Sequence, residues 1–136
     1  MLTVLFISKM QLEKYLKEKY NFYSELNFVE FNSGWNEIIK NLSEEINKIL
    51  GEDTKYFSVV QIKQKFGGLR YYYDIDYDKI DDEKLDKIKE AIEKAEEKSF
   101  QTCEICGNIG ELKSNGYWIF TTCDECEKIN DKTNLC

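Results

Sequence analysis

The pattern of apolar and polar positions predicts three helices, each with one apolar face. In each segment, apolar side chains recur every three or four residues, and charged side chains fill most of the positions between them. The most regular stripe includes Trp35, which we therefore assign to the core, and Gly51 follows its last apolar position as a helix-ending residue. The predicted helices cover residues 10–20, 34–50 and 82–98.

Two segments between the second and third helices predict a β-hairpin. Residues 56–63 are rich in side chains that favour strands, and residues 69–75 alternate between apolar and polar types. The pair Gly67-Gly68 between them predicts the turn. The alternation directs one set of side chains to the core and the other to water. The inward set is Leu69, Tyr71, Tyr73 and Ile75, and the outward set is Arg70, Tyr72 and Asp74.

These elements predict an α+β fold with a small C-terminal module. The chain has 136 residues, a length that one hydrophobic core can serve. We expect residues 1–100 to form an α+β core domain in which helices pack on a short antiparallel sheet. Residues 101–136 are expected to form a zinc-ribbon-like module packed on that domain. The aromatic segment 22–31 is expected to wrap the core as extended or irregular chain.

Four cysteines near the C-terminus have the spacing of a zinc site. Cys103 and Cys106 form one Cys-x-x-Cys pair, and Cys123 and Cys126 form the second. Each pair can fold into a knuckle that presents two thiolates to one tetrahedral ion, and residues 114–116 between the pairs can form a hairpin turn. Two disulfides are the alternative, but a chain with five cysteines and no recognisable signal peptide favours zinc.

A site of four sulfurs has no open coordination position, so one Zn²⁺ ion would stabilise the fold and not catalyse a reaction. The fifth cysteine, Cys136, is interpreted as a free thiol, with a metal-assisting or intermolecular role left open. The sequence contains no histidine and no recognisable pairing of nucleophile and base. We therefore do not expect an enzyme.

The charge of the chain argues against a broad nucleic-acid interface. The formal net charge is −7, whereas binding to a duplex needs many cations that neutralise phosphates, so duplex nucleic acid is not an expected partner. The apolar segment Met1 to Ile7 has no basic residues before it and is too short to cross a bilayer. We expect a cytoplasmic protein that has no membrane interaction.

Residues 54–73 form the longest stretch without an acidic side chain, and they contain Arg70, the only arginine. Three cations there flank a glycine pair that would permit close approach of a ligand, which suits a phosphate or carboxylate. An ordinary hairpin turn with solubilising lysines explains the same residues, and we weigh the two interpretations equally. The candidate ligand-binding residues are Lys63, Lys65, Phe66, Gly67, Gly68, Arg70 and Tyr72.

The sequence resembles a family of small, mostly uncharacterised proteins of tailed phages and prophages. The most specific match is the block from Lys65 to Tyr72, Lys-Phe-Gly-Gly-Leu-Arg-x-Tyr, and the resemblance extends to Gly34-Trp35, Ala95-Glu-x-x-Ser99 and the segment Thr102 to Gly107. Many such relatives are expected to carry Cys-x-x-His as the second knuckle. The resemblance implies a phage or prophage context, hence the cytoplasm of a host cell, without an established activity.

Several functions follow as hypotheses. The leading one is a non-enzymatic binder that holds an anionic small molecule or nucleotide signal, as in counter-defence. The second is an adaptor whose acidic helix and C-terminal hairpin, with Tyr117, Trp118 and Phe120, dock on a host or phage protein. Binding of a short single strand at the basic turn comes third, and an enzyme fourth. Formation of a homo-oligomer is left open, because the many aromatic residues suit a dense core equally well.

Overall fold

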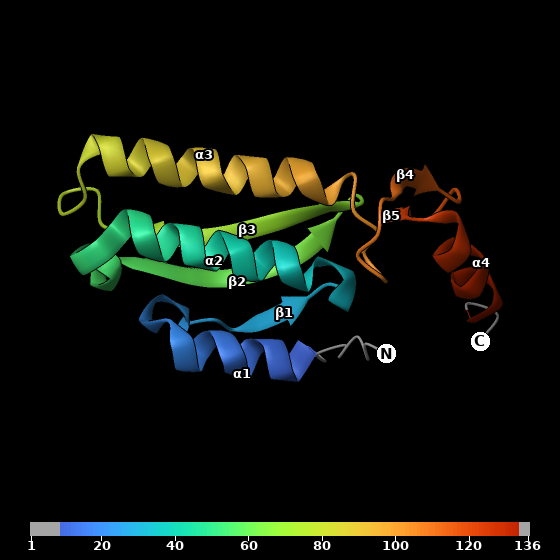
Figure 1. The fold of residues 1–136 in the computed structure, drawn as a ribbon, viewed down its shortest axis with the longest axis horizontal. Coiled ribbons are helices and arrows are strands. Elements are labelled where there is room, and N and C mark those ends of the chain that lie inside the picture. Colours follow the sequence, from blue (N-terminus) through green and yellow to red (C-terminus); the bar gives the residue numbers. More distant parts are fainter. Residues whose placement is uncertain (1–8, 134–136) are drawn as a thin grey trace.

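The computed structural model describes residues 9–133 and shows an α+β fold, as predicted. A three-stranded sheet packs against helices, and a two-stranded hairpin with a short helix follows at one end of the sheet (Figure 1). The expectations for Met1 to Ile7 and for Cys136 lie outside the described residues. The elements are α1 Lys9–Lys19, β1 Phe28–Glu30, α2 Asn36–Leu50, β2 Phe57–Lys65, β3 Gly68–Ile75, α3 Asp82–Ser99, β4 Glu111–Ser114, β5 Ile119–Thr122 and α4 Asp124–Thr133.

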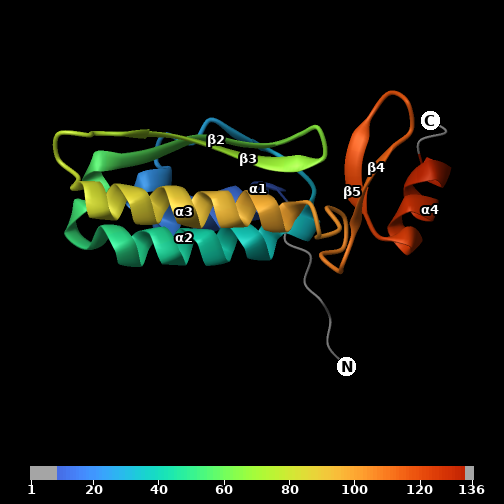
Figure 2. The same ribbon diagram turned by 90° about the horizontal axis from the view of Figure 1, so that it is seen from above.

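The two long helices, α2 and α3, lie side by side on one face of the sheet (Figure 2). α2 begins after a short 3-10 turn, Ser33–Trp35, and the Trp35 side chain is fully buried, as predicted. α3 begins where the carboxylate of Asp81 accepts a hydrogen bond from the backbone N–H of Lys84. The apolar stripes that predicted these helices form the core between them and the sheet.

The sheet has the order β1-β2-β3 and contains one parallel pair, which differs from the antiparallel sheet that we predicted. β3 runs antiparallel to β2, but β1 runs parallel to it, with Val29 opposite Ile62. A parallel pair requires a crossover connection, and α2 lies in the segment that joins β1 to β2. The segment 22–31 thus contributes a strand, and Phe22, Tyr23 and Phe31 belong to the core.

The two faces of the β2–β3 hairpin differ as the alternation predicted. Leu69 and Tyr71 are buried against the helices, whereas Arg70, Tyr72 and Asp74 are exposed on the opposite face. The turn lies one residue earlier than predicted. Lys65 pairs with Gly68, so the two turn residues are Phe66 and Gly67, with φ of 54° and 83°. Positive φ at both residues is what a two-residue type I′ turn requires.

The C-terminal module, which the structure describes over residues 101–133, contains the first pair of cysteines, the β4–β5 hairpin and α4, a helix that we did not predict. The hairpin lies beyond the tip of β2 and β3, as both views of the ribbon show (Figures 1 and 2). Gly116, with φ of 95°, lies in the turn that joins the two strands, within the segment predicted as a turn. Within residues 9–133, no helix has both the length and the apolar character needed to cross a bilayer.

Candidate metal centre and binding surface

The four predicted cysteines come together in the C-terminal module. Their sulfur atoms all lie within 4.8 Å of one another, and the sulfurs of Cys106 and Cys123 are 3.7 Å apart. A tetrahedral ion with metal–sulfur bonds of about 2.3 Å separates its ligands by about 3.8 Å. Cys103 and Cys126 are buried, and the other two are partly exposed. The cluster therefore has the size and the donor set to hold one metal ion.

Each pair of cysteines is shaped by its own backbone turn. In the first knuckle, the carbonyl of Cys103 accepts a hydrogen bond of 2.9 Å from the N–H of Gly107, whose φ is 84°. A positive φ favours glycine at this position. In the second knuckle, α4 begins directly after Cys123, and the N–H of Cys126 donates to the Cys123 sulfur at 3.4 Å. The knuckles thus present both pairs of sulfurs to a common point.

The protein surroundings alone do not favour four thiolates at this point. The N–H of Cys126 lowers the pKa of the Cys123 thiol to about 7. Burial has the opposite effect and raises the pKa of the Cys106 and Cys126 thiols. Because burial penalises the charged form, the cluster can carry several negative charges only when a cation balances them.

Backbone contacts bind the first knuckle to the start of α2. The N–H of Gly34 donates to the carbonyl of Glu104 at 2.8 Å, and the indole N–H of Trp35 donates to the carbonyl of Thr102 at 2.9 Å. A side chain at position 34 would overlap with the backbone of Cys103 and Glu104. The Gly34-Trp35 pair therefore serves to seat the metal module on the core.

The Glu104 side chain strengthens the same junction, a role that no sequence signal predicted. It is only 7% exposed, although it is a carboxylate. One of its oxygens accepts a hydrogen bond from the amide of Asn32, and the other accepts from the Gln64 amide and the backbone N–H of Thr121. These donors come from three separate segments, so the carboxylate joins β2, the start of α2 and β5. A buried polar group needs such partners to offset the loss of hydration.

The predicted anion-binding residues divide into two groups. Lys63 and Arg70 face each other across β2 and β3, and Tyr72 lies on the same outer face. The Lys63 ammonium is 5.7 Å from the centre of the Tyr72 ring. Lys65 follows Lys63 on the same face, since it lies two residues further along the strand. We call these four residues, Lys63, Lys65, Arg70 and Tyr72, the basic face.

The glycine pair belongs to the second group, and protein atoms fill the space beside it. A methyl group at Gly67 would overlap with the Leu112 side chain, and one at Gly68 would overlap with the ring of Phe100. The carbonyl of Gly67 also accepts a hydrogen bond of 2.7 Å from the Thr121 hydroxyl. Both glycines are buried. The C-terminal module thus approaches Gly67, the Phe100 ring approaches Gly68, and neither glycine leaves space for a ligand there.

A groove next to the basic face joins the β2–β3 turn to the tip of the C-terminal hairpin. Its volume is about 290 Å³. All three aromatic side chains that line it are strongly exposed: Phe66 at 63%, Tyr117 at 93% and Trp118 at 70%. The Lys65 ammonium is 5.7 Å from the centre of the Phe66 ring, so this lysine belongs to both surfaces. The groove is lined by Gln64, Lys65, Phe66, Tyr117, Trp118 and Ile119.

Phe120, which we grouped with Tyr117 and Trp118 as a docking residue, is buried at 9% exposure. It faces the opposite side of β5 from Ile119, which is exposed. Tyr117 and Trp118 are exposed and lie in the turn before that strand. The groove was not predicted, because its two halves are about fifty residues apart in the sequence.

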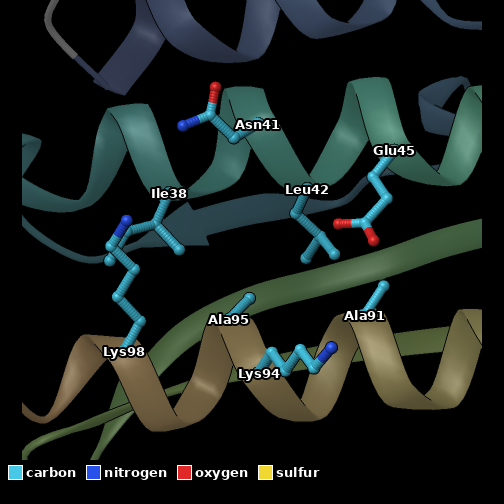
Figure 3. A pocket seen from close by; sticks show the side chains of 8 residues that line it. All are labelled: Ile38, Asn41, Leu42, Glu45, Ala91, Lys94, Ala95 and Lys98. Carbon is cyan, nitrogen blue, oxygen red and sulfur yellow. The ribbon is translucent and has the colours of Figure 1, made fainter.

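A second hollow, of about 170 Å³, lies between α2 and α3 (Figure 3). Its base is aliphatic, and its rim carries charges of both signs, with Glu45 on α2 facing α3 and Lys98 extending toward α2. The mixed charge does not select for an anion, in contrast to the basic face. Its lining is Ile38, Asn41, Leu42, Glu45, Ala91, Lys94, Ala95 and Lys98.

No family model, no curated protein and no solved structure matches the chain. The function is therefore inferred from the geometry and chemistry of the cysteine cluster and of the basic face with its adjacent groove.

Proposed function

We propose that the protein is a non-enzymatic, zinc-stabilised binding protein that holds a phosphate-bearing ligand of the nucleotide type on its basic face. The observation that carries this proposal is that Lys63, Lys65 and Arg70 share one face of the hairpin with an exposed aromatic ring, Tyr72, in a protein of net charge −7. In a chain with this charge, a local group of cations is a selective feature. Cations suit phosphates, and the ring suits a base.

The role proposed for the metal is structural. A set of four sulfurs is typical of zinc and of iron–sulfur centres, and four ligands leave no position open for a substrate. Zinc needs no redox partner and tolerates a tetrahedral site shaped by two knuckles, so we propose Zn²⁺. Its contribution to binding would be indirect, because the module that it stabilises contacts the turn of the β2–β3 hairpin through Gly67 and Leu112.

The biological setting that we propose follows from the resemblance to phage proteins. A small binder of nucleotides inside an infected cell could sequester a signal of host defence. This part of the proposal depends on the identity of the ligand, so the titration that identifies the ligand also tests it.

Titration calorimetry of the metal-loaded protein against linear and cyclic nucleotides tests the proposal. We expect binding of at least one phosphate-bearing ligand, and we expect Arg70→Ala to weaken it about tenfold or more, because hydrogen bonds to charged groups contribute about 1.5–3 kcal/mol. Arg70→Lys keeps the charge but loses the planar fork, and should recover only part of the affinity. Lys89→Ala, an exposed cation on α3, is the matched control and should bind as the wild type does.

An adaptor that docks on a protein partner is the second candidate. Tyr117 and Trp118 favour it, because aromatic residues of this exposure are enriched at protein interfaces. Capture of a protein partner by two variants distinguishes the adaptor from the nucleotide binder. An adaptor would capture a stoichiometric protein partner, and capture would survive Arg70→Ala but fail with Trp118→Ala. Absence of heat with every nucleotide, together with such a partner, would replace the first proposal by the second.

A further inference from the structure

Phe66 occupies an unfavourable position for its residue type. It is the first residue of the two-residue turn and has φ of 54°, a left-handed conformation that is a genuine outlier for a bulky side chain. Asn, Asp or Gly would fit this position better. Most of its ring is also exposed to solvent. Strained and exposed aromatic residues suggest a functional role, because neither feature helps the fold.

The opposite wall of the groove holds its aromatic residues in a defined turn. The side-chain oxygen of Asn115 accepts hydrogen bonds from the backbone N–H groups of Tyr117 and Trp118, at 3.0 and 2.8 Å. These bonds fix the backbone of the turn while both side chains remain exposed. The Gln64 amide donates to the carbonyl of Ile119 at 3.1 Å and joins the two walls. The groove is therefore formed in the free protein.

The groove and the basic face form one continuous surface along the hairpin. The row of Gln61 and Tyr72 lies four residues from the row of Lys65 and Gly68, a distance of about 13 Å at the rise of a β-strand. Cations and aromatic rings are interleaved along this path: Lys63 contacts the Tyr72 ring, and Lys65 contacts the Phe66 ring. Such a repeat matches a ligand in which phosphates and bases also repeat.

Acidic residues border the surface at its other end and on its β1 side. Asp74 follows Tyr72 on the outer face of β3, and Glu30 on β1 lies beside Lys63. A polyanion on the basic face is therefore directed toward the groove. The narrow width of the surface and the net charge of −7 disfavour a duplex, whose two backbones need broad positive potential.

We infer that the ligand of this protein is a short single-stranded nucleic acid, whose phosphates lie along Lys63, Arg70 and Lys65 and whose bases stack on Tyr72, Phe66 and Trp118. This inference rests on the proposed function and names its ligand class. A single nucleotide would use one cation and one ring and leave the rest of the surface empty.

A length series tests the inference. Mononucleotides, dinucleotides, an eight-nucleotide single strand and the matching duplex are titrated into metal-loaded protein, with tryptophan fluorescence as the signal. Trp35 is fully buried and Trp118 is exposed, so a change reports on the groove. We expect the single strand to bind at least tenfold tighter than a mononucleotide and tighter than the duplex, with an affinity that falls as salt rises.

The matched variants are Phe66→Asn and Tyr77→Asn. Both remove an aromatic ring that is about two-thirds exposed, but Tyr77 lies in the loop before α3, away from the groove. Phe66→Asn is expected to weaken single-strand binding about tenfold and to leave the melting temperature unchanged or higher, because Asn suits the turn. Tyr77→Asn is expected to bind as the wild type does. Trp118→Ala removes the fluorescent reporter, so its binding is measured by calorimetry and is expected to be weaker.

Equal affinity for mononucleotide and single strand would overturn this inference and leave the proposed function standing. No binding of any nucleotide would overturn both. Length-dependent binding that Phe66→Asn and Trp118→Ala do not change would show that the strand bypasses the groove, and would overturn the placement. Tighter binding of the duplex than of the single strand would also overturn it.

Discussion

The hydroxyl of Thr121 donates a hydrogen bond of 2.7 Å to the carbonyl of Gly67. This bond joins the metal-binding module to the turn that carries Phe66, although the two residues are far apart in the sequence. Leu112 packs against the same glycine. The position of the groove therefore depends on the fold of the module, which we propose that a bound metal ion stabilises.

Removal of one metal ligand should affect both the stability and the groove. Cys106→Ser is expected to abolish stoichiometric zinc and to lower the free energy of unfolding by about 4 kcal/mol or more, the range reached when a metal site is lost. Metal analysis and thermal unfolding, with and without a chelator, measure this. Cys136→Ser is the control and should keep one zinc per chain. Iron in place of zinc, or full metal content in Cys106→Ser, would contradict the assignment.

Substitution at Gly34 should separate the module from the core. In Gly34→Ala the added methyl group overlaps with the backbone of Cys103 and Glu104, which cannot move away as a flexible side chain could. We expect destabilisation of about 1–3 kcal/mol or more from this overpacking. In Gly116→Ala the methyl group meets no atom within 4 Å, and only the positive φ costs about 1–2 kcal/mol. Urea denaturation compares the two, and a smaller loss for Gly34→Ala would contradict this role.

Glu104→Gln should weaken the same junction without removing the metal. A carboxylate can accept from all three of its donors, whereas the amide nitrogen of glutamine cannot accept and would face one of them. The expected loss is about 1–3 kcal/mol in the free energy of unfolding, with zinc retained. Glu111→Gln, on the exposed strand β4, should change stability little. Equal stability of the two variants would show that the Glu104 hydrogen bonds contribute nothing.

Glu96, next to the basic face, should give stability a pH dependence. Burial raises the pKa of its carboxyl group, and the N–H of Tyr71 and the nearby Arg70 reduce this increase. The pKa of Glu96 in the folded protein thus lies above its unfolded value near 4.5. The contribution of this carboxyl group to the free energy of unfolding is therefore present below pH 4.5 and is lost as pH rises through the folded pKa.

Glu96→Gln should therefore be more stable than the wild type at pH 7 and show no such advantage at pH 4. It should also bind anions more tightly, because a negative charge near Arg70 is removed. Thermal unfolding at both pH values measures the first effect and calorimetry the second. The exposed Glu93→Gln on α3 is the control, and an advantage of Glu96→Gln that persists at pH 4 would contradict the account.

Local sequence signals predicted most of the fold. The apolar stripe of α2, the alternation in β3 and the spacing of the four cysteines each depend on nearby residues, and the structure confirms all three. β1 was missed because it has only three residues and pairs with a distant strand. α4 was missed because its sequence is almost entirely polar and offers no apolar stripe.

The candidate site was predicted only in part, because long-range packing determines the rest. The alternation predicted Arg70 and Tyr72 on one outward face, and the strand register places Lys63 on that face as well. It could not show that Phe100 and Leu112 occupy the space beside Gly67 and Gly68. The observed turn, Phe66 and Gly67, lies one residue before the predicted one. The register of the hairpin, and not the preference of phenylalanine, determines the backbone conformation of Phe66.

The most direct test of the account is an NMR titration of ¹⁵N-labelled, zinc-loaded protein with an eight-nucleotide single strand. We predict that the backbone amide signals of residues 63–72 and 115–119 shift together and saturate at one ligand per chain, while those lining the hollow between α2 and α3 stay unchanged (Figure 3). Shifts that cluster on α2 and α3, or no shifts at saturating ligand, would contradict it.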